Sequence, residues 1–344
     1  MRLLKRKGGP LEEDIGPHCC KVFLFIPSSV FPSTLDFIVL PMSSSTKTVD
    51  RDIVYAPISN WEKHTLDIYY PSRHYDDEVC GHWARSLIVF VHGGAWRSGD
   101  KSGFVQLAKD LAESTGDVVA VVNYTLSIAA IKDDPTSVPA KVQHPKHVND
   151  LATALAFLYT RGLDSGDYNP ESMFLVGHSA GGQITGLLAL RPDTYLEPAE
   201  FAAKLPRGTL HGSIKGVIGV EGIYDVDKLL KTWPSYRDFV IQGFGQDPEA
   251  LIKGSPQGQQ VPSSEDEAPF VLPLYAVIHS NQDGLVDPAQ ANDYVAHLQA
   301  VAGADKEDRV AIEFGDWGSH DDMLQTAQFT RTVTTFLDGW KKRK

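Results

Sequence analysis

Cysteine and positive charge are both scarce in this chain, and long hydrophobic runs are missing. The 3 cysteines among 344 residues, Cys19, Cys20 and Cys80, argue against a disulfide framework and make a reducing, cytoplasmic location the expectation. The net charge of −12 disfavours nucleic acid and anionic membranes as partners. Apolar runs are strand-sized, far below the ~18 residues of a membrane span. A small-molecule substrate is compatible with all of these absences.

The first 45 residues differ from the rest of the chain. Basic residues near the start precede an apolar run at 22–26, but acidic residues intervene and Pro27 ends the run, which is a poor match to a signal peptide. Met42 begins a stretch that resembles a polar N-terminus. We expect residues 1–45 to be a disordered or wrongly predicted tail, and residues 46–344 to form a single domain.

Strand and helix patterns alternate after this tail. Two short runs, 52–55 and 65–70, predict an antiparallel pair at a sheet edge. Further strand patterns follow at 87–91, 118–122, 173–176, 214–220, 274–278 and 310–314. The run 87–91 is continuously apolar, which is typical of a strand covered on both faces, whereas Gly216 and Gly219 break the run 214–220. Between and after these strands, apolar residues recur at the spacing of a helix, at 103–114, 145–162, 183–190 and 288–300. A closing helix contains Phe329, Val333 and Phe336 at the same spacing.

This alternation predicts an α/β fold with a mostly parallel sheet and helices on both faces. Gly162 is expected to end the second of the helices. Residues 225–270 interrupt the alternation, because they are rich in proline, glycine and aspartate with aromatic residues scattered among them. We predict that they form a lid-like insertion.

The stretch from Met173 to Gly182 carries the strongest chemical signal. An apolar strand runs into the pattern G-x-S-x-G, and small residues then continue into a helix. A strand-to-helix turn of this kind holds its serine, here Ser179, in a strained conformation with Oγ exposed above the sheet. Gly177 and Gly181 remove side chains that would collide in the turn.

A nucleophilic serine needs a base, and that base needs an acid to orient it. Asp283 and His320 follow Ser179 in the chain order of this fold, each in a loop after a predicted strand, where ligand sites of parallel sheets form. We assign His320 as general base and then general acid, and Asp283 as the residue that fixes its tautomer. Asp287 is the rival acid, but its place before Pro288 favours a helix cap.

The other histidines are given structural roles. His144 and His147 flank a helix start without a third metal ligand, and His178 is expected to pack in the turn around Ser179. His18 precedes two cysteines, but no second ligand cluster follows at zinc-finger spacing. We therefore expect no metal.

The tetrahedral intermediate of such a reaction needs preorganised donors for its oxyanion. The first candidate is the backbone N–H of Ala180, the residue after the nucleophile. The others are the N–H groups of Gly93 and Gly94, because a Gly-Gly turn lets the backbone approach the substrate closely.

Together these motifs resemble the α/β-hydrolase superfamily. Residues 92–96, His-Gly-Gly-Ala-Trp, look like the H-G-G-x-W signature of the kynurenine formamidase (arylformamidase) family, and residues 177–182 are similar to its nucleophile segment. The likeness covers roughly residues 52–340. It implies a serine hydrolase that converts N-formyl-L-kynurenine to L-kynurenine and formate in tryptophan catabolism, without a cofactor. Glu221 departs from the pattern, because it is acidic where a small residue is expected.

Several alternatives stay open. Trp96 or Tyr124 is a candidate to stack on the substrate's ring, and packing under the loop is the other interpretation of Trp96. A general carboxylesterase would use the same triad. A non-catalytic binding module of the same fold is expected to have lost one triad residue, whereas all three have candidates here. The sequence is compatible with a monomer or a homodimer.

Overall fold

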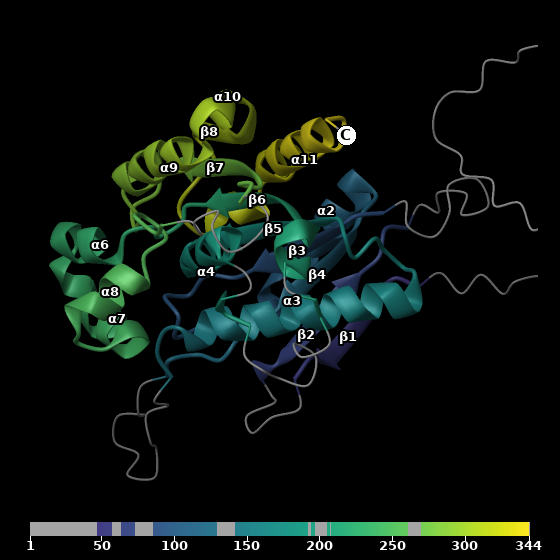
Figure 1. Cartoon of the computed structure of the whole chain (residues 1–344), viewed down its shortest axis with the longest axis horizontal. Helices are drawn as coiled ribbons and strands as arrows, with labels where there is room; N and C mark the ends of the chain where they lie inside the picture. The colour runs from purple at the N-terminus through teal and green to yellow at the C-terminus, as the bar shows by residue number, and fades with distance from the viewer. Residues whose placement is uncertain are drawn as a thin grey trace, which may run out of the picture.

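The computed structural model describes residues 47–56, 63–72, 85–128, 142–191, 194–196, 205–206, 208–260 and 270–343 (Figure 1). The expected tail, all three cysteines and residues 261–269 of the predicted insertion lie outside these ranges. Eight strands within them form one sheet in the order β1-β2-β4-β3-β5-β6-β7-β8. The strands are β1 Val49–Val54, β2 Thr65–Tyr69, β3 Leu87–Val91, β4 Val118–Val122, β5 Met173–His178, β6 Ile214–Val220, β7 Leu274–Ser280 and β8 Val310–Gly315.

Strand directions confirm the predicted arrangement. β1 pairs with β2 and β2 with β4 in antiparallel fashion, and every later pairing is parallel. The second strand differs from its alternating sequence pattern, because all of its residues are buried. Its one carboxylate, Asp67, is compensated by the ammonium of Lys101, which lies 2.7 Å from Oδ1. A buried ion pair thus fills the position where the pattern suggests a solvent-facing residue.

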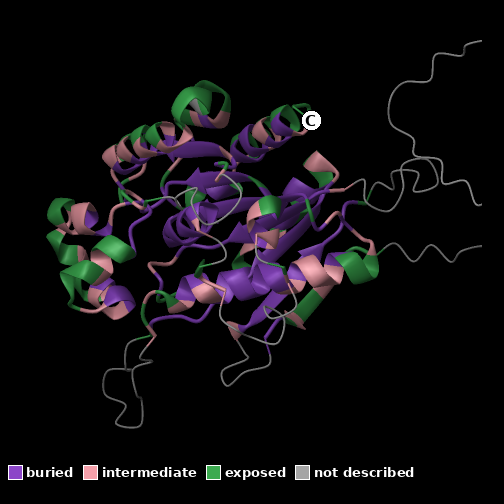
Figure 2. Ribbon diagram, viewed as in Figure 1, coloured by how far each residue is buried: buried purple, intermediate pink, exposed green. Residues whose placement is uncertain are grey.

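Helices cover both faces of the sheet, as predicted. One apolar cluster joins alternate residues of the central strands, such as Ile88 and Phe90, to α2 Val105–Thr115 and α11 Ala327–Lys341. The other cluster joins Leu87 and Val89 to the opposite layer, which contains α3 Lys146–Ser165, α4 Ala180–Leu190 and α9 Pro288–Ala302. Figure 2 shows the strands buried between these layers. Shorter elements are α5 Thr209–Ser213, α10 Lys306–Arg309, and 3₁₀ turns at Lys101–Phe104, Gly303–Asp305 and Asp322–Gln325.

The helix predicted to end at Gly162 is longer than expected. α3 continues through this glycine and ends at Gly166, whose φ of 70° is the left-handed cap that stops it. Gly162 instead serves packing, since a Cβ there would lie 2.7 Å from the ring of Tyr168. The glycine was a packing signal and not a stop signal.

The described part of the predicted insertion is helical. It contains α6 Val226–Thr232, a 3₁₀ turn at Pro234–Tyr236, α7 Arg237–Phe244 and α8 Pro248–Lys253, which stand together at one end of the molecule (Figure 1). Much of their outer surface is exposed (Figure 2). Movement of these helices as a lid stays a prediction. None of the described helices is both long enough and apolar enough to cross a bilayer.

Candidate active site

Ser179 lies in the sharp turn between β5 and α4. Its φ of 55° and ψ of −118° are strained for a residue with a side chain. The glycines on either side are required by contact, because a Cβ at Gly177 would lie 2.3 Å from Thr185 Oγ1 and one at Gly181 would lie 2.1 Å from Val91 O. The Ser179 N–H donates to Val220 O at 2.9 Å, which fixes the turn to the neighbouring strand β6.

Asp283 and His320 come together in the structure. Asp283 Oδ2 accepts a hydrogen bond from His320 Nδ1 at 2.8 Å, and Oδ1 accepts from the N–H groups of Leu285 and Val286 at 2.8 and 3.0 Å. Burial raises the pKa of Asp283, but these hydrogen bonds, the one from His320 foremost, outweigh it and bring the pKa below its usual value. The carboxylate is therefore ionised at neutral pH and suited to hold one tautomer of the imidazole.

Hydrogen bonds from β5 and β7 hold the loop that carries His320. His178 Nε2 donates to the carbonyl of His320 at 3.0 Å, and the two rings lie 4.6 Å apart. Ser280 Oγ donates to Gly318 O at 2.7 Å, which ties the end of β7 to the same loop. His178 immediately precedes Ser179 in the chain, so this contact joins the histidine loop to the nucleophile turn. The packing role predicted for His178 includes this hydrogen bond.

The Gly-Gly turn after β3 lies against the nucleophile. A Cβ built on Gly93 would be 2.9 Å from Ser179 Cβ, so only glycine allows the backbone this close. Gly94 has a φ of 99°, which glycine adopts without strain, whereas the positive φ values of Ala95 and Trp96 strain the two residues that follow. Ala180 begins α4, and the first N–H groups of a helix have no acceptor within it. Gly93 and Ala180 therefore lie beside Ser179, and the role of the three N–H groups as oxyanion donors stays a prediction.

Trp96 and Tyr124 are fully buried, which matters for the predicted ring stacking. Trp96 Nε1 donates to Gln183 Oε1 at 2.8 Å, and its ring packs edge-on against Phe244. The Tyr124 hydroxyl lies 3.0 Å from His92 O and 3.1 Å from Gly93 O, where it donates to these carbonyls. Neither ring presents a face to solvent, so the geometry favours packing for Trp96 and support of the Gly-Gly turn for Tyr124. Stacking on a substrate stays an untested prediction.

The remaining polar candidates have structural partners. Asp287 caps α9 by accepting from the N–H of Ala289 at 3.0 Å, which confirms its assignment as a helix cap. His147 bonds to Ser127 Oγ at 2.9 Å, and burial lowers its pKa to about 4. His144 is half-buried against the rings of Phe244 and Tyr195, and desolvation lowers its pKa to about 4.

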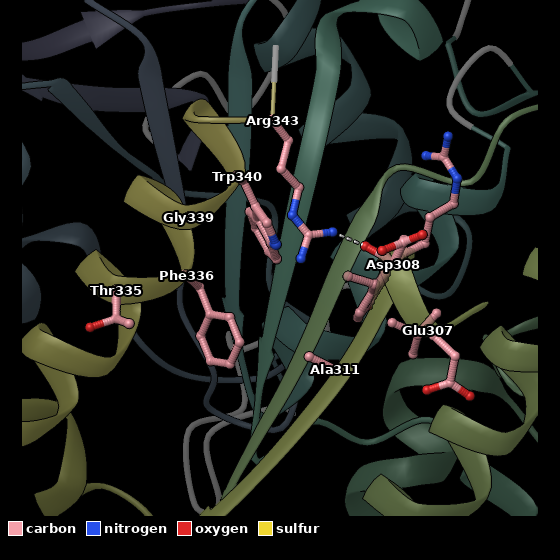
Figure 3. Close-up of a pocket in the computed structure, with 11 residues that line it drawn as sticks. Glu307, Asp308, Ala311, Thr335, Phe336, Gly339, Trp340 and Arg343 are labelled. Carbon is pink, nitrogen blue, oxygen red and sulfur yellow. Dashed lines mark hydrogen bonds between the residues drawn. The ribbon is translucent and has the colours of Figure 1, made fainter. Parts of the chain in front are cut away.

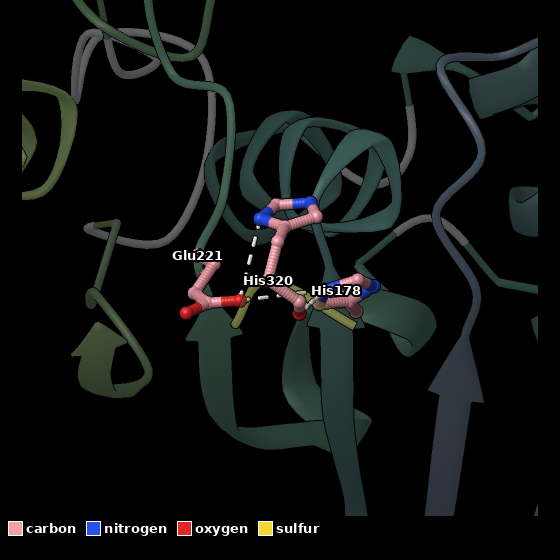
Figure 4. A group of neighbouring side chains, drawn as sticks. All are labelled: His178, Glu221 and His320. Carbon is pink, nitrogen blue, oxygen red and sulfur yellow. Dashed lines mark hydrogen bonds and ion pairs between the residues drawn. The ribbon is translucent and has the colours of Figure 1, made fainter. Parts of the chain in front are cut away.

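Glu221 is the residue of this site that sequence reasoning missed. Its side chain is fully buried, and Oε2 lies 3.3 Å from His320 Nδ1 and 3.7 Å from His178 Nε2 (Figure 4). The signal that pointed to it was an acidic residue directly after a buried strand, at a place where a small residue was expected. A pattern cannot show that the carboxyl turns inward, because this depends on a φ of 47° at Glu221 itself.

His178, Glu221 and His320 also form a group in which the possible ligand atoms lie within 4.8 Å of one another. Both imidazole nitrogens involved already act as hydrogen-bond donors, one to a backbone carbonyl and one to Asp283. A metal would require both donors to lose a proton and their present acceptors. The chemistry of this donor set therefore fits hydrogen bonding better than metal coordination.

A separate pocket lies away from these residues. Its volume is about 110 Å³, it lies between the start of β8 and the end of α11, and Figure 3 shows Phe336, Trp340, Arg343 and Asp308 around it. β8 begins there, whereas the loop with His320 follows its end. The pocket is thus on the opposite edge of the sheet from Ser179.

Known proteins share both the sequence pattern and the fold of this chain. A family model described as BD-FAE matches residues 66–298, more than half of the chain. The chain belongs to the BD-FAE family. Structures similar to it include esterase B from Lactobacillus rhamnosis, with a TM-score of 0.63 and 17% identity over 86% of this chain and 85% of that one. A carbohydrate esterase from gut microbiota has a TM-score of 0.62 and 17% identity over 86% and 96% of the chains. These likenesses confirm the α/β-hydrolase fold.

Sequence relatives of this BD-FAE family member point to the same class of enzyme. A kynurenine formamidase of Meyerozyma guilliermondii is 27% identical over 72% of this chain and 82% of that protein. Another, from Eremothecium gossypii, is 29% identical over 73% and 92%. The expected resemblance to kynurenine formamidases is confirmed, and the protein is a hydrolase.

Proposed function

We propose that this BD-FAE family hydrolase removes the formyl group from an aryl formamide, N-formyl-L-kynurenine, and releases L-kynurenine and formate in tryptophan breakdown. The observation that carries the proposal is the 2.8 Å hydrogen bond between Asp283 and His320, held against the turn of a strained Ser179. The similarity to fungal kynurenine formamidases supports the choice of substrate.

In the proposed reaction, Ser179 Oγ attacks the formyl carbon while His320 Nε2 takes its proton. The N–H groups of Ala180, Gly93 and Gly94 stabilise the oxyanion. His320 then returns the proton to the departing aryl amine, which leaves a formyl-enzyme ester. A water molecule, deprotonated by His320, attacks this ester, and formate leaves as Ser179 regains its proton. Asp283 holds the Nδ1 proton on the imidazole throughout.

The space around Ser179 supports a small acyl group. Ser179 is buried, and the backbone of Gly93 packs directly against its Cβ. Formyl is the smallest acyl group, so it needs the least room beside the oxyanion donors. An aryl amine also requires a general acid as it departs, and protonated His320 supplies one.

A general carboxylesterase is the second candidate. Esterase LipC of Mycobacterium tuberculosis is 27% identical over 63% of this chain and 49% of that protein. The same residues would serve both reactions, so only the preferred acyl and leaving groups distinguish them. We place the enzyme in the cytoplasm because its cysteines are few. Formation of a homodimer stays a prediction.

The test is formate release from N-formyl-L-kynurenine by the purified protein and by Ser179→Ala, with p-nitrophenyl acetate and butyrate as comparison esters. We expect kcat/KM to be highest for the formamide and to fall at least 10³-fold in Ser179→Ala. Higher kcat/KM for the butyrate ester would identify a carboxylesterase instead. Equal rates for both proteins would refute the serine mechanism.

A further inference from the structure

Two carboxyl groups face the same imidazole nitrogen of His320. Asp283 follows β7 and its Oδ2 lies 2.8 Å from Nδ1; Glu221 follows the neighbouring strand β6 and its Oε2 lies 3.3 Å from the same atom. The two strands pair in register, and the N–H of Glu221 extends the pairing by donating to Ile278 O at 2.8 Å. The ends of two adjacent parallel strands therefore each place one acid beside the same base, and Figure 4 shows Glu221 next to His320.

Glu221 is held in place at some cost to the fold. Its positive φ of 47° is unfavourable for a residue with a side chain, and its carboxyl is removed from water. Oε1 accepts a hydrogen bond from the N–H of Ser280 at 3.2 Å. Oε2 is buried and makes no hydrogen bond within the described part of the chain, so it points at the imidazoles without a partner of its own.

The titratable groups around Glu221 come from three strands or from the loops that follow them. His320 and Asp321 follow β8, His178 belongs to β5, Asp283 follows β7, and His279 of β7 lies with Nε2 3.7 Å from Asp283 Oδ2. Burial lowers the pKa of His178 to about 3, and burial also lowers that of His279, so both are neutral at pH 7.

The two carboxyl groups differ in ionisation. Burial, and next the charge of Asp283, raise the pKa of Glu221 to about 9. The pKa of Asp283 lies below its usual value because of its hydrogen bonds. At neutral pH the pair thus carries one negative charge, on Asp283, and Glu221 keeps its proton.

We propose that Glu221 is a second acid of the site: a positioning residue that packs beside Asp283 against His320 and that can orient the Nδ1 proton in place of Asp283 when a neutral residue replaces the aspartate. The proposal rests on the serine-hydrolase mechanism above. When Asp283 is replaced by a neutral residue, the repulsion that opposes ionisation of Glu221 disappears. Glu221 can then release its proton to solvent at a lower pH and accept the hydrogen bond from Nδ1, while Nε2 still takes the proton of Ser179.

The activity test compares Asp283→Asn with the double variant Asp283→Asn/Glu221→Gln between pH 6 and 10, on the formamide and on p-nitrophenyl acetate. Loss of a triad acid without a substitute lowers kcat by roughly 10⁴-fold. We expect the single variant to exceed the double variant by about 10-fold or more in kcat at the alkaline end, with activity that rises as one proton is lost. Equal kcat values at every pH would overturn the proposal.

A matched control removes a different carboxylate from the same loop. Asp283→Asn/Asp287→Asn should have the pH profile of Asp283→Asn alone, because Asp287 caps α9 and asparagine is an equivalent cap. If Asp283→Asn/Asp287→Asn loses as much activity as Asp283→Asn/Glu221→Gln, the loss is an effect of net charge or of stability, and the proposal fails.

A second measurement needs no substrate. In protein labelled with ¹³C at glutamate carboxyl carbons, we expect one resonance that titrates near pH 9 and is absent from Glu221→Gln. Titration of every glutamate in the ordinary acidic range would overturn the proposal. Failure of the proposed function has a different signature, namely wild-type protein that hydrolyses neither substrate, or a Ser179→Ala form that remains active.

Discussion

Replacing Gly93 by alanine tests how closely the oxyanion turn must approach the nucleophile. The added methyl carbon would lie 2.9 Å from Ser179 Cβ and 3.0 Å from His178 Nδ1, whereas carbon atoms in contact are normally about 3.5–4.0 Å apart. One side must therefore move by roughly half an ångström or more. The backbone of Ser179 is held by the hydrogen bond that its N–H donates to Val220 O, so we expect the Gly93 turn to shift instead.

A shifted turn withdraws the N–H of Gly93 from the developing oxyanion. Loss of one such donor costs about 2.7–4 kcal/mol of transition-state stabilisation, which is about 10²–10³ in kcat. KM should change little, because the donor acts on the transition state more than on the bound substrate. The fold should persist, since the glycine is not in the left-handed region and alanine adds no backbone strain there.

The assay is steady-state formate release, with thermal unfolding as the check on folding. Gly103→Ala is the matched control, because a Cβ at that position meets nothing within 4 Å. Wild-type kcat in a folded Gly93→Ala protein would refute the close approach of turn and nucleophile. A rise in KM with unchanged kcat would also refute it.

Three further predictions concern Tyr124, Glu221 and Gly216. Tyr124→Phe keeps the ring but removes the hydroxyl that donates to His92 O and Gly93 O. The free energy of unfolding should fall by about 1–3 kcal/mol, and kcat should fall with it. Full activity in kinetic assays would contradict a supporting role for the hydroxyl. Glu221 has its pKa raised from 4.5 to about 9, so between these values the folded state retains a proton that the unfolded state releases, and its contribution to stability falls as pH rises. Denaturant unfolding at pH 6, 7.5 and 9 should therefore show a smaller decline for Glu221→Gln than for wild type, and equal declines would contradict the raised pKa. Gly216→Ala should destabilise by about 1–3 kcal/mol in the same assay, because its methyl would lie 2.5 Å from the ring of Trp340, while kcat stays at the wild-type value; unaltered stability would mean that α11 is not tightly packed on β6.

Much of the fold could be predicted because the informative signals are local. The strands β3 and β4 are apolar throughout, since both of their faces are covered, and the run 87–91 coincides with β3 in the structure. The positions of Asp283 and His320 followed from the same reasoning, because residues after parallel strands share one edge of the sheet. Their hydrogen bond is present in the structure, and their catalytic roles are proposals.

The remaining features depend on contacts that no local pattern contains. Asp67 is buried because Lys101, 34 residues away, reaches it, and Gly162 lies within a helix because the ring of Tyr168 needs the space. Glu221 was noticed only as a departure from a pattern. Its partnership with His320 arises from a backbone strain at one residue and from strands that pair across long stretches of sequence.

The most direct test of the account is to locate the nucleophile chemically. A fluorophosphonate ester, which phosphonylates an activated serine, is incubated with the wild-type protein and the modified peptide is identified by mass spectrometry. We predict a single adduct on Ser179 that forms at least 10³-fold more slowly in His320→Ala. An adduct on another residue, or equal labelling rates in the two proteins, would contradict the central claim that His320 activates Ser179.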